Sequence, residues 1–119
     1  MKKSSLLFAF LFSAVYLFAQ EPVSADSLAK YEGQLVTVCA KVTGTHITNG
    51  KSKTTFINFG KPFPNHTFSV VIFEKDLQNF TYKPAKKLLD KKICVSGKIK
   101  IYNGKPEMII SLEDQIRIE

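Results

Sequence analysis

The residues best suited to take part in recognition are phenylalanines that alternate with other side chains in TFINFGKPFPNHTFSVVIF, residues 55–73. They are Phe56, Phe59, Phe63, Phe68 and Phe73. An aromatic ring on an open strand is a platform for a planar ligand, and stacking contributes about 1–3 kcal/mol per nucleobase. The same ring is also an ordinary core residue. The pattern by itself leaves both interpretations open.

Basic side chains form the second candidate group. The chain has 17 Lys and Arg against 10 Asp and Glu, a net charge of +7, and Arg117 is its only arginine. The excess favours an anionic partner. Because the charge is nearly all lysine, it argues against a site that needs bidentate guanidinium contacts to phosphate. A solvated surface that keeps the protein soluble is the alternative.

Residue types for catalysis or metal binding are sparse. No set of nucleophile, base and orienting group is evident. His46 and His66 lie near expected turns, and a zinc site would need Cys39 and Cys94 as further ligands. These cysteines lack the Cys-x-x-Cys spacing of thiol oxidoreductases. We therefore expect no metal, no cofactor and no enzymatic activity.

The N-terminus reads as a targeting segment. Two lysines precede an apolar run over residues 6–18, and Ala19 follows it. This order is typical of a secretory signal peptide, and the run is shorter than the roughly 18 residues of a spanning helix. An N-terminal membrane anchor is the alternative. Cleavage after Ala19, or after Ala25, would give a secreted or periplasmic protein without a membrane span; the first site leaves 15 basic and 10 acidic residues, a net charge of +5.

Behind the signal, alternating patterns predict five strands. They are expected at residues 33–47, 54–60, 67–73, 92–102 and 106–112. Asn49-Gly50 and Asn103-Gly104 predict tight turns. Residues 74–92 read as a helical insert broken at Pro84, and a short helix is expected near residues 27–31. The tail at 113–119 can pair back onto the strands.

Three strands, a helical insert and two more strands are the element order of the OB-fold, an all-β, five-stranded, partly open barrel. We expect a signal peptide at 1–19, an N-terminal tail at 20–30 and the OB-fold domain at 31–119. Gly44 and Gly97 lie within strands, which predicts bulges or sharp bends at barrel corners.

Three segments carry a family resemblance: YEGQLVTVCAKVTG, TFINFGKPFPNHTFSVVIF and KKICVSGKIKIYNGKPEMII. They resemble a group of small exported bacterial OB-fold proteins, similar to the wider family of tRNA-anticodon-type OB domains. The resemblance covers about residues 31–118. It is specific for the fold and for this group, and the wider family implies a role with nucleic acid.

The resemblance also implies site residues. In that family the second strand carries Phe-apolar-polar-apolar, and its aromatic ring points out of the barrel to stack on a base. FINF matches this motif, which implies that Phe56 and Asn58 face outward while Ile57 and Phe59 lie in the core. Burial of Phe56 under a loop or the N-terminal segment is the alternative.

The third strand has two apolar faces. Phe68, Val70 and Ile72 share the outer face if Ser69 points inward, but a period of two does not decide which face is core. The wider family often has a polar reader on this strand. Val70 stands at that place, which argues against base-specific readout.

In OB-folds the loops between strands 1 and 2 and between strands 4 and 5 flank the binding face. The alternation along their strands places Lys41 and Lys98 on the outer face of the barrel. Lys53 lies on the first of these loops, and Tyr102 adjoins the second. A basic groove beside aromatic rings suits single-strand binding without sequence preference. The predicted nucleic-acid-binding residues are Phe56, Asn58, Phe68, Lys41, Lys53, Lys98 and Tyr102.

The two cysteines are predicted to form a disulfide. In an OB barrel the first and fourth strands are antiparallel neighbours, and Cys39 and Cys94 both have outward parity. Opposite residues have Cβ atoms about 4.5–5.5 Å apart, which is close to disulfide range, and an exported protein meets an oxidising compartment. Two free thiols or a redox pair are the alternatives.

The leading hypothesis is an exported OB-fold protein that binds single-stranded DNA or RNA, or another anionic polymer, across the second and third strands. The alternatives are a module that docks an envelope protein through its apolar outer face and a small-ligand binder. Polyanion binding weakens with salt, whereas apolar docking does not. A nuclease is not expected, because the lone Arg117 has no matching acidic cluster.

Overall fold

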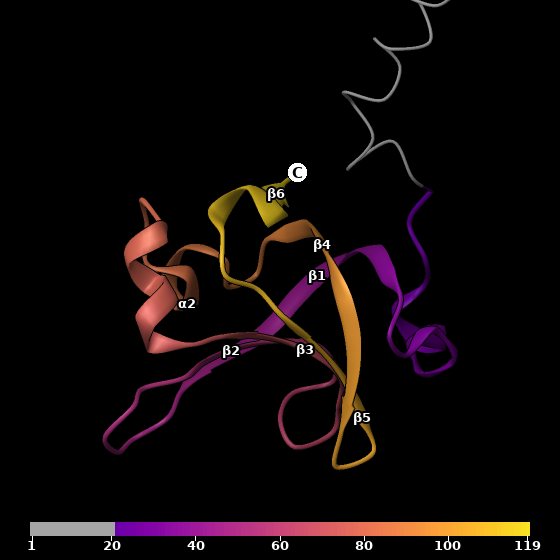
Figure 1. Ribbon diagram of the computed structural model, residues 1–119, viewed down its shortest axis with the longest axis horizontal. Helices are drawn as coiled ribbons and strands as arrows, with labels where there is room; N and C mark the ends of the chain where they lie inside the picture. The colour runs from indigo at the N-terminus through magenta and orange to yellow at the C-terminus, as the bar shows by residue number, and fades with distance from the viewer. Residues whose placement is uncertain (1–20) are drawn as a thin grey trace, which may run out of the picture.

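The computed structural model describes residues 21–119, and their main feature is a small β-barrel (Figure 1). In chain order, with η for a 3-10 helix, the elements are η2 (Ala25–Tyr31), β1 (Leu35–Ile47), β2 (Thr55–Gly60), β3 (His66–Ile72), η3 (Glu74–Asn79), α2 (Pro84–Lys87), β4 (Lys92–Tyr102), β5 (Lys105–Ile109), η4 (Glu113–Gln115) and β6 (Ile116–Ile118). The five expected strands are all present. The predicted signal peptide at 1–19 lies outside the described residues.

The strands form one sheet that closes on itself. Their order is β1-β2-β3-β5-β4-β6, and β1 also pairs with β4, which makes a barrel of the first five. Neighbours are antiparallel except β3 and β5, which run parallel. The C-terminal β6 pairs back onto the start of β4, as predicted. A closed five-stranded barrel with a helical insert between β3 and β4 confirms the OB-fold.

Strand β1 takes part in two pairings because it bends in its middle. Its first half pairs with β4, from Leu35 to Lys41, and its second half pairs with β2. The register shifts between Val42 and Gly44, which confirms the bulge predicted at Gly44. No bulge occurs at Gly97, because the register between β1 and β4 is regular there.

The reason for a glycine at position 97 is close packing inside the barrel. A Cβ atom on Gly97 would lie 2.7 Å from Cγ of Met108. Real Cβ atoms do not approach a neighbour so closely, so the missing side chain is what allows the Met108 side chain of β5 to pack beside β4.

The core lies inside the barrel and is almost entirely aliphatic and aromatic. Val36, Val38 and Val42 of β1 face it, as the alternation predicts. Leu28 of η2 is only 1% exposed and joins the same cluster. Residues expected as an N-terminal tail therefore contribute a side chain to the core, through a helix at the place where a short one was expected.

The face of β3 corrects the sequence analysis. Phe68, Val70 and Ile72 belong to the core cluster, and each is 0% exposed. The register with β2 explains this, because Phe68 lies opposite Phe59 and directly paired residues point to the same side of a sheet. The two rings stack with centroids 5.2 Å apart. Phe68 is thus unavailable to a ligand, and its assignment to the binding site is wrong.

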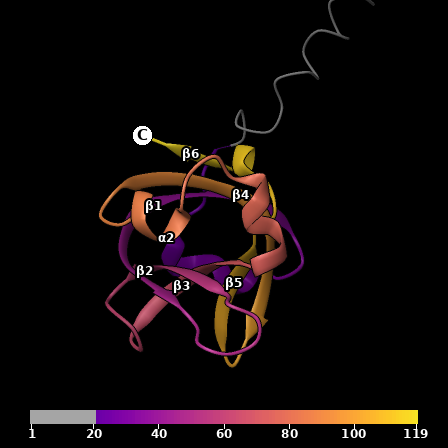
Figure 2. The same cartoon turned by 90° about the vertical axis from the view of Figure 1, so that its left-hand side faces the viewer.

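The helical insert begins with η3 and ends with α2, which lies at one end of the barrel (Figure 2). The insert is two short helices separated at residues 80–83, so the predicted break is present directly before Pro84. Pro84 starts α2, where its missing N–H is not needed.

Cys39 and Cys94 are direct partners in the β1–β4 pairing and form a disulfide, with Cα atoms 4.0 Å apart. The predicted cross-strand bond is confirmed. Structural disulfides persist in oxidising compartments, so the bond supports an extracellular type of environment. In residues 21–119, no helix has the length and apolar character needed to cross a bilayer.

Reducing the disulfide is expected to lower the free energy of unfolding by about 2–4 kcal/mol, because the bond restricts the unfolded chain. Urea denaturation with and without dithiothreitol measures the change. The Cys39→Ser/Cys94→Ser double variant is the control, and its urea midpoint of unfolding is expected to be the same with and without the reductant. Equal midpoints for the oxidised and reduced wild-type protein would contradict a stabilising role.

Candidate functional site

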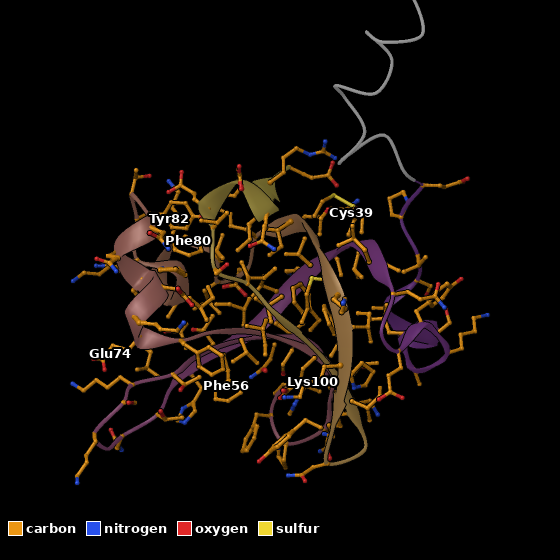
Figure 3. The ribbon with its side chains drawn as sticks, in the orientation of Figure 1. Cys39, Phe56, Glu74, Phe80, Tyr82 and Lys100 are labelled. Atoms are coloured by element: carbon orange, nitrogen blue, oxygen red, sulfur yellow. A yellow bond between two sulfur atoms is a disulfide. The ribbon has the colours of Figure 1, made fainter. Side chains whose placement is uncertain are left out.

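A groove of about 480 Å³ crosses the outer face of the sheet where β2, β3 and β5 lie together. Its lining residues are His46, Thr48, Phe56, Asn58, Phe63, Pro64, His66, Ser69, Tyr102, Asn103, Lys105 and Glu107. Figure 3 shows Phe56 on the side of the barrel away from Cys39. The groove therefore lies apart from the disulfide.

A row of polar residues crosses the floor of the groove from strand to strand. Asn58 of β2 lies opposite Ser69 of β3, Ser69 lies opposite Glu107 of β5, and Glu107 lies opposite Lys100 of β4. Paired residues point to the same face, so the barrel register alone brings these four side chains into line. Ser69, rather than Val70, is the polar residue that β3 presents outward.

Asn58 is held in place by this row. It is 3% exposed, and the Ser69 hydroxyl donates a hydrogen bond of 2.6 Å to its Oδ1. Because the carbonyl oxygen is used internally, the side-chain NH₂ is the group that Asn58 can offer to a ligand.

An apolar row runs beside the polar one. Phe56 lies opposite Val71, and Val71 lies opposite Ile109. Val71 is 4% exposed, whereas Phe56 is half-buried and lines the groove. Phe56 thus faces outward, as the resemblance implies, with part of its ring covered.

Three stacked rings form one wall of the groove. Phe63, on the loop between β2 and β3, is 69% exposed. Its ring centroid lies 6.3 Å from that of His46 and 5.5 Å from that of His66, and the interplanar angles are 19° and 14°. The Lys105 ammonium group donates a hydrogen bond to the Pro64 carbonyl oxygen. The loop is therefore fastened at both the aromatic wall and the β4–β5 turn.

The electrostatics of the groove are set by one acidic and several basic groups. Burial raises the pKa of Glu107, and the nearby Lys100 partly opposes this effect. Burial, followed by the charge of Lys105, lowers the pKa of His66. The His66 Nδ1 is buried and makes no hydrogen bond within residues 21–119. Burial and the charge of Lys105 both disfavour the charged imidazolium of His66, so the lysines are the main source of positive charge.

The structure brings some of the predicted site residues together. Phe56, Asn58 and Tyr102 line the groove, and Tyr102 is 55% exposed. Lys98 is exposed on β4, two residues before Lys100, but does not line the groove. Lys53 lies on the β1–β2 loop outside the lining residues, where its backbone N–H donates to Glu74 Oε1 at 3.4 Å.

Lys41 lies elsewhere. It precedes the bend at Gly44 and pairs with Lys92 of β4, two residues beyond the disulfide position. Outward parity predicted its exposure correctly, but the bend sends the two halves of β1 to different parts of the barrel. The structure does not bring Lys41 to the groove.

The groove residues that the sequence analysis missed as parts of a site include His46, His66, Ser69 and Glu107. Phe63 was among the candidate aromatic residues, and Lys105 lies directly after the Asn103-Gly104 turn that was expected to flank the site, but neither was assigned to the site. The outward position of Ser69 and Glu107 depends on strand register, which the sequence does not display.

Cys39, Cys94 and Glu119 place potential metal-ligand atoms within 4.8 Å of one another. In the described protein the two sulfur atoms are bonded to each other. Cysteine binds a metal ion as the free thiolate. While the disulfide is intact, these two cysteines therefore cannot serve as metal ligands.

Comparison with known proteins supports the fold. No protein-family model and no curated protein matches the sequence. Among solved structures, the chain is similar to asparaginyl-tRNA synthetase from Pyrococcus horikoshii, with 14% identity and a TM-score of 0.53 over 82% of this chain and 23% of that one. A second match is a putative aspartyl-tRNA synthetase from Leishmania major Friedlin, at 12% identity and a TM-score of 0.46 over 99% of this chain and 26% of that one. This chain spans about a quarter of either protein, and such identities establish the fold alone.

The stability of the protein is expected to respond differently when Phe68 in the core and Phe63 on the wall of the groove are each replaced by alanine. Phe68→Ala should lower the free energy of unfolding by about 3–5 kcal/mol, because it empties part of a packed core. Phe63→Ala should change it by no more than about 0.5 kcal/mol, because the ring is largely solvent-exposed. Urea denaturation measures both, and similar losses for the two variants would refute the assignment of inner and outer faces.

Proposed function

We propose that the protein binds single-stranded nucleic acid, or another extended anionic polymer, in the groove over β2, β3 and β5, after export to the periplasm or the medium. It acts as a binding protein without a catalytic step or a cofactor. The observation that carries the proposal is that the exposed rings of Phe63 and Tyr102 and the Lys105 side chain share one groove on the outer face of an OB-fold barrel.

The aromatic residues give the groove its stacking surfaces. Phe56 on the floor, Phe63 on the β2–β3 loop and Tyr102 beside the β4–β5 turn all line it. Every nucleobase has a flat apolar face, so rings of this kind bind bases without distinguishing among them. In the proposal, the Asn58 NH₂ adds a hydrogen-bond donor at the floor.

The lysines provide contacts for phosphates along one edge. Lys105 lines the groove, while Lys98 and Lys100 project from the same face of β4, because alternate residues of a strand point to one side. Glu107, on the floor of the groove opposite Lys100, carries the opposite charge. This arrangement favours a strand that keeps its phosphates at the lysine edge and turns its bases toward the aromatic rings.

The fold comparison adds support of a general kind. The asparaginyl-tRNA synthetase with the same fold is named for a nucleic acid, tRNA. We extend that class of ligand to this chain as part of the proposal. The resemblance of the FINF segment to anticodon-type OB domains points the same way.

Docking of an envelope protein is the weaker alternative, because its main basis does not hold. It required Phe68, Val70 and Ile72 to form an apolar outer face, and all three are core residues. A small planar ligand is the better second candidate, since a groove of about 480 Å³ is large enough for one and falls in the usual range of about 300–1,000 Å³.

Binding of a fluorescein-labelled oligothymidylate, followed by anisotropy, tests the proposal. Phe56→Ala and Phe63→Ala are each expected to weaken binding by about 5- to 150-fold, as loss of one stacked base predicts. Three phosphate contacts predict about a twentyfold loss of affinity between 50 and 200 mM salt.

Phe73→Ala is the matched control, because Phe73 is 38% exposed and lies outside the groove lining. It should bind like the wild-type protein. Absence of binding at 50 mM salt, or equal loss in all three variants, would sink the nucleic-acid proposal. Binding of mononucleotides as tightly as of the oligomer would instead support the small-ligand candidate.

The pH dependence of binding tests the role of Glu107. Because its pKa is raised, the carboxylate takes up a proton at a higher pH than an ordinary glutamate, and its repulsion of phosphate disappears as the pH falls. Glu107→Gln should therefore bind the oligomer about fivefold more tightly than wild type at pH 7.5, the effect of one nearby charge. The two proteins should converge toward pH 5, and equal affinity at pH 7.5 would show that Glu107 does not face the ligand.

A further inference from the structure

Six lysines gather around the end of the barrel where α2 lies. They are Lys41, Lys83, Lys86, Lys87, Lys91 and Lys92, and together with Leu89 we call them the α2 patch. All six are exposed. Between residues 83 and 92 the only acidic residue is Asp90. None of these residues lines the groove, so the α2 patch has no part in the function proposed above.

The packing of α2 explains why its lysines face solvent. Pro84 and Leu88 are buried, and residues four apart lie on one face of a helix. This face is fixed on the barrel, because Leu88 is 0% exposed and belongs to the core cluster. Lys86 and Lys87 lie between these two anchors in the sequence and are directed outward.

The remaining lysines adjoin α2 through backbone hydrogen bonds. The Val42 N–H donates to the Lys91 carbonyl oxygen at 2.8 Å, and the Asp90 N–H donates to the Val42 carbonyl oxygen at 3.2 Å. The turn after α2 is thereby joined to β1 directly beside Lys41. The α2 patch is therefore one continuous surface built from the helix, the turn and the β1–β4 pair.

Within this surface, like charges stand opposite each other. Lys41 and Lys92 are direct cross-strand partners on the outer face, an arrangement that costs stability. The six ammonium groups form no ion pair within residues 21–119. An external layer of negative charge would relieve this repulsion, so the arrangement favours an anionic partner outside the chain.

The composition of the α2 patch favours a lipid surface over a nucleic acid. Its members include no arginine for bidentate phosphate contacts. The rings of Phe80 and Tyr82 adjoin Lys83, but Phe80 is buried, Tyr82 is half-buried and the two pack edge to face, so neither presents an open face for stacking. Anionic headgroups attract clustered lysines without requiring a fixed geometry. Leu89 lies among the lysines and is 40% exposed, and such an apolar side chain can enter the headgroup region.

We propose that the α2 patch docks the protein on an anionic lipid bilayer. Figure 1 shows α2 and the β4–β5 turn at different ends of the barrel. A protein bound through α2 therefore leaves the groove open to solution, and the two surfaces can be occupied at the same time.

Co-sedimentation of the full chain with vesicles tests this proposal. The vesicles contain phosphatidylcholine alone or with 40 mol% phosphatidylglycerol, at 50 and 300 mM salt. Lys86→Glu/Lys87→Glu should raise the lipid concentration for half-binding to the anionic vesicles by at least about 25-fold, since each lysine contributes about fivefold. Wild type and variants share residues 1–20, so their difference isolates the patch.

Lys30→Glu/Lys51→Glu is the charge-matched control, with both changes at exposed positions on η2 and the β1–β2 loop, outside the α2 patch. It should bind anionic vesicles nearly as well as wild type. Equal loss in the two double variants would overturn the proposal in favour of a general charge effect. Loss of oligothymidylate binding with unchanged vesicle binding in Lys86→Glu/Lys87→Glu would assign the patch to nucleic acid instead.

A fluorescence measurement identifies the contacting face directly. The chain has no tryptophan, so Leu89→Trp introduces a single reporter. Its emission should shift to shorter wavelength on anionic vesicles and not on phosphatidylcholine alone. Leu35→Trp, at a position that is 57% exposed and distant from α2, should not shift, and a shift confined to Leu35→Trp would place the membrane contact elsewhere.

Discussion

The pairing of β1 with β4 is the interaction on which the rest of the structure depends. It converts a sheet into a closed barrel, and it is reinforced by the Cys39–Cys94 disulfide and by a hydrogen bond of 2.7 Å between Thr37 and Ser96. With its first half committed to β4, β1 must bend at Gly44 for its second half to reach β2. That bend sets His46 opposite Phe56 at the groove.

The groove is a product of strand register more than of loops. Asn58, Ser69, Glu107 and Lys100 come from four different strands, yet each lies directly opposite the next. The connecting segments complete the rim of the groove through Thr48, Phe63, Pro64 and Asn103. A site of this kind is held by the same hydrogen bonds that hold the barrel, so its floor should be far more rigid than its rim.

Alternation along single strands was sufficient to predict the five strands, and their order around the helical insert predicted the barrel. The disulfide followed from the pairing of the first and fourth strands in such a barrel and from the outward position of both cysteines. Alternation failed on β3, where both faces are apolar and only the partner strand decides. Phe68 is inside because Phe59 is inside and the two are paired. It also failed for Lys41, since parity gives the direction of a side chain and not its distance from a site beyond a bend.

The close packing of Met108 against Gly97 is a part of the core that leaves no room for a larger residue at position 97. On β5, Met108 stands between Glu107 in the groove and Ile109 beside it. A Cβ atom at position 97 would require the Met108 side chain to shift from its place against β4. The packing beneath the floor of the groove thus depends in part on a residue inside the barrel that does not itself line the groove.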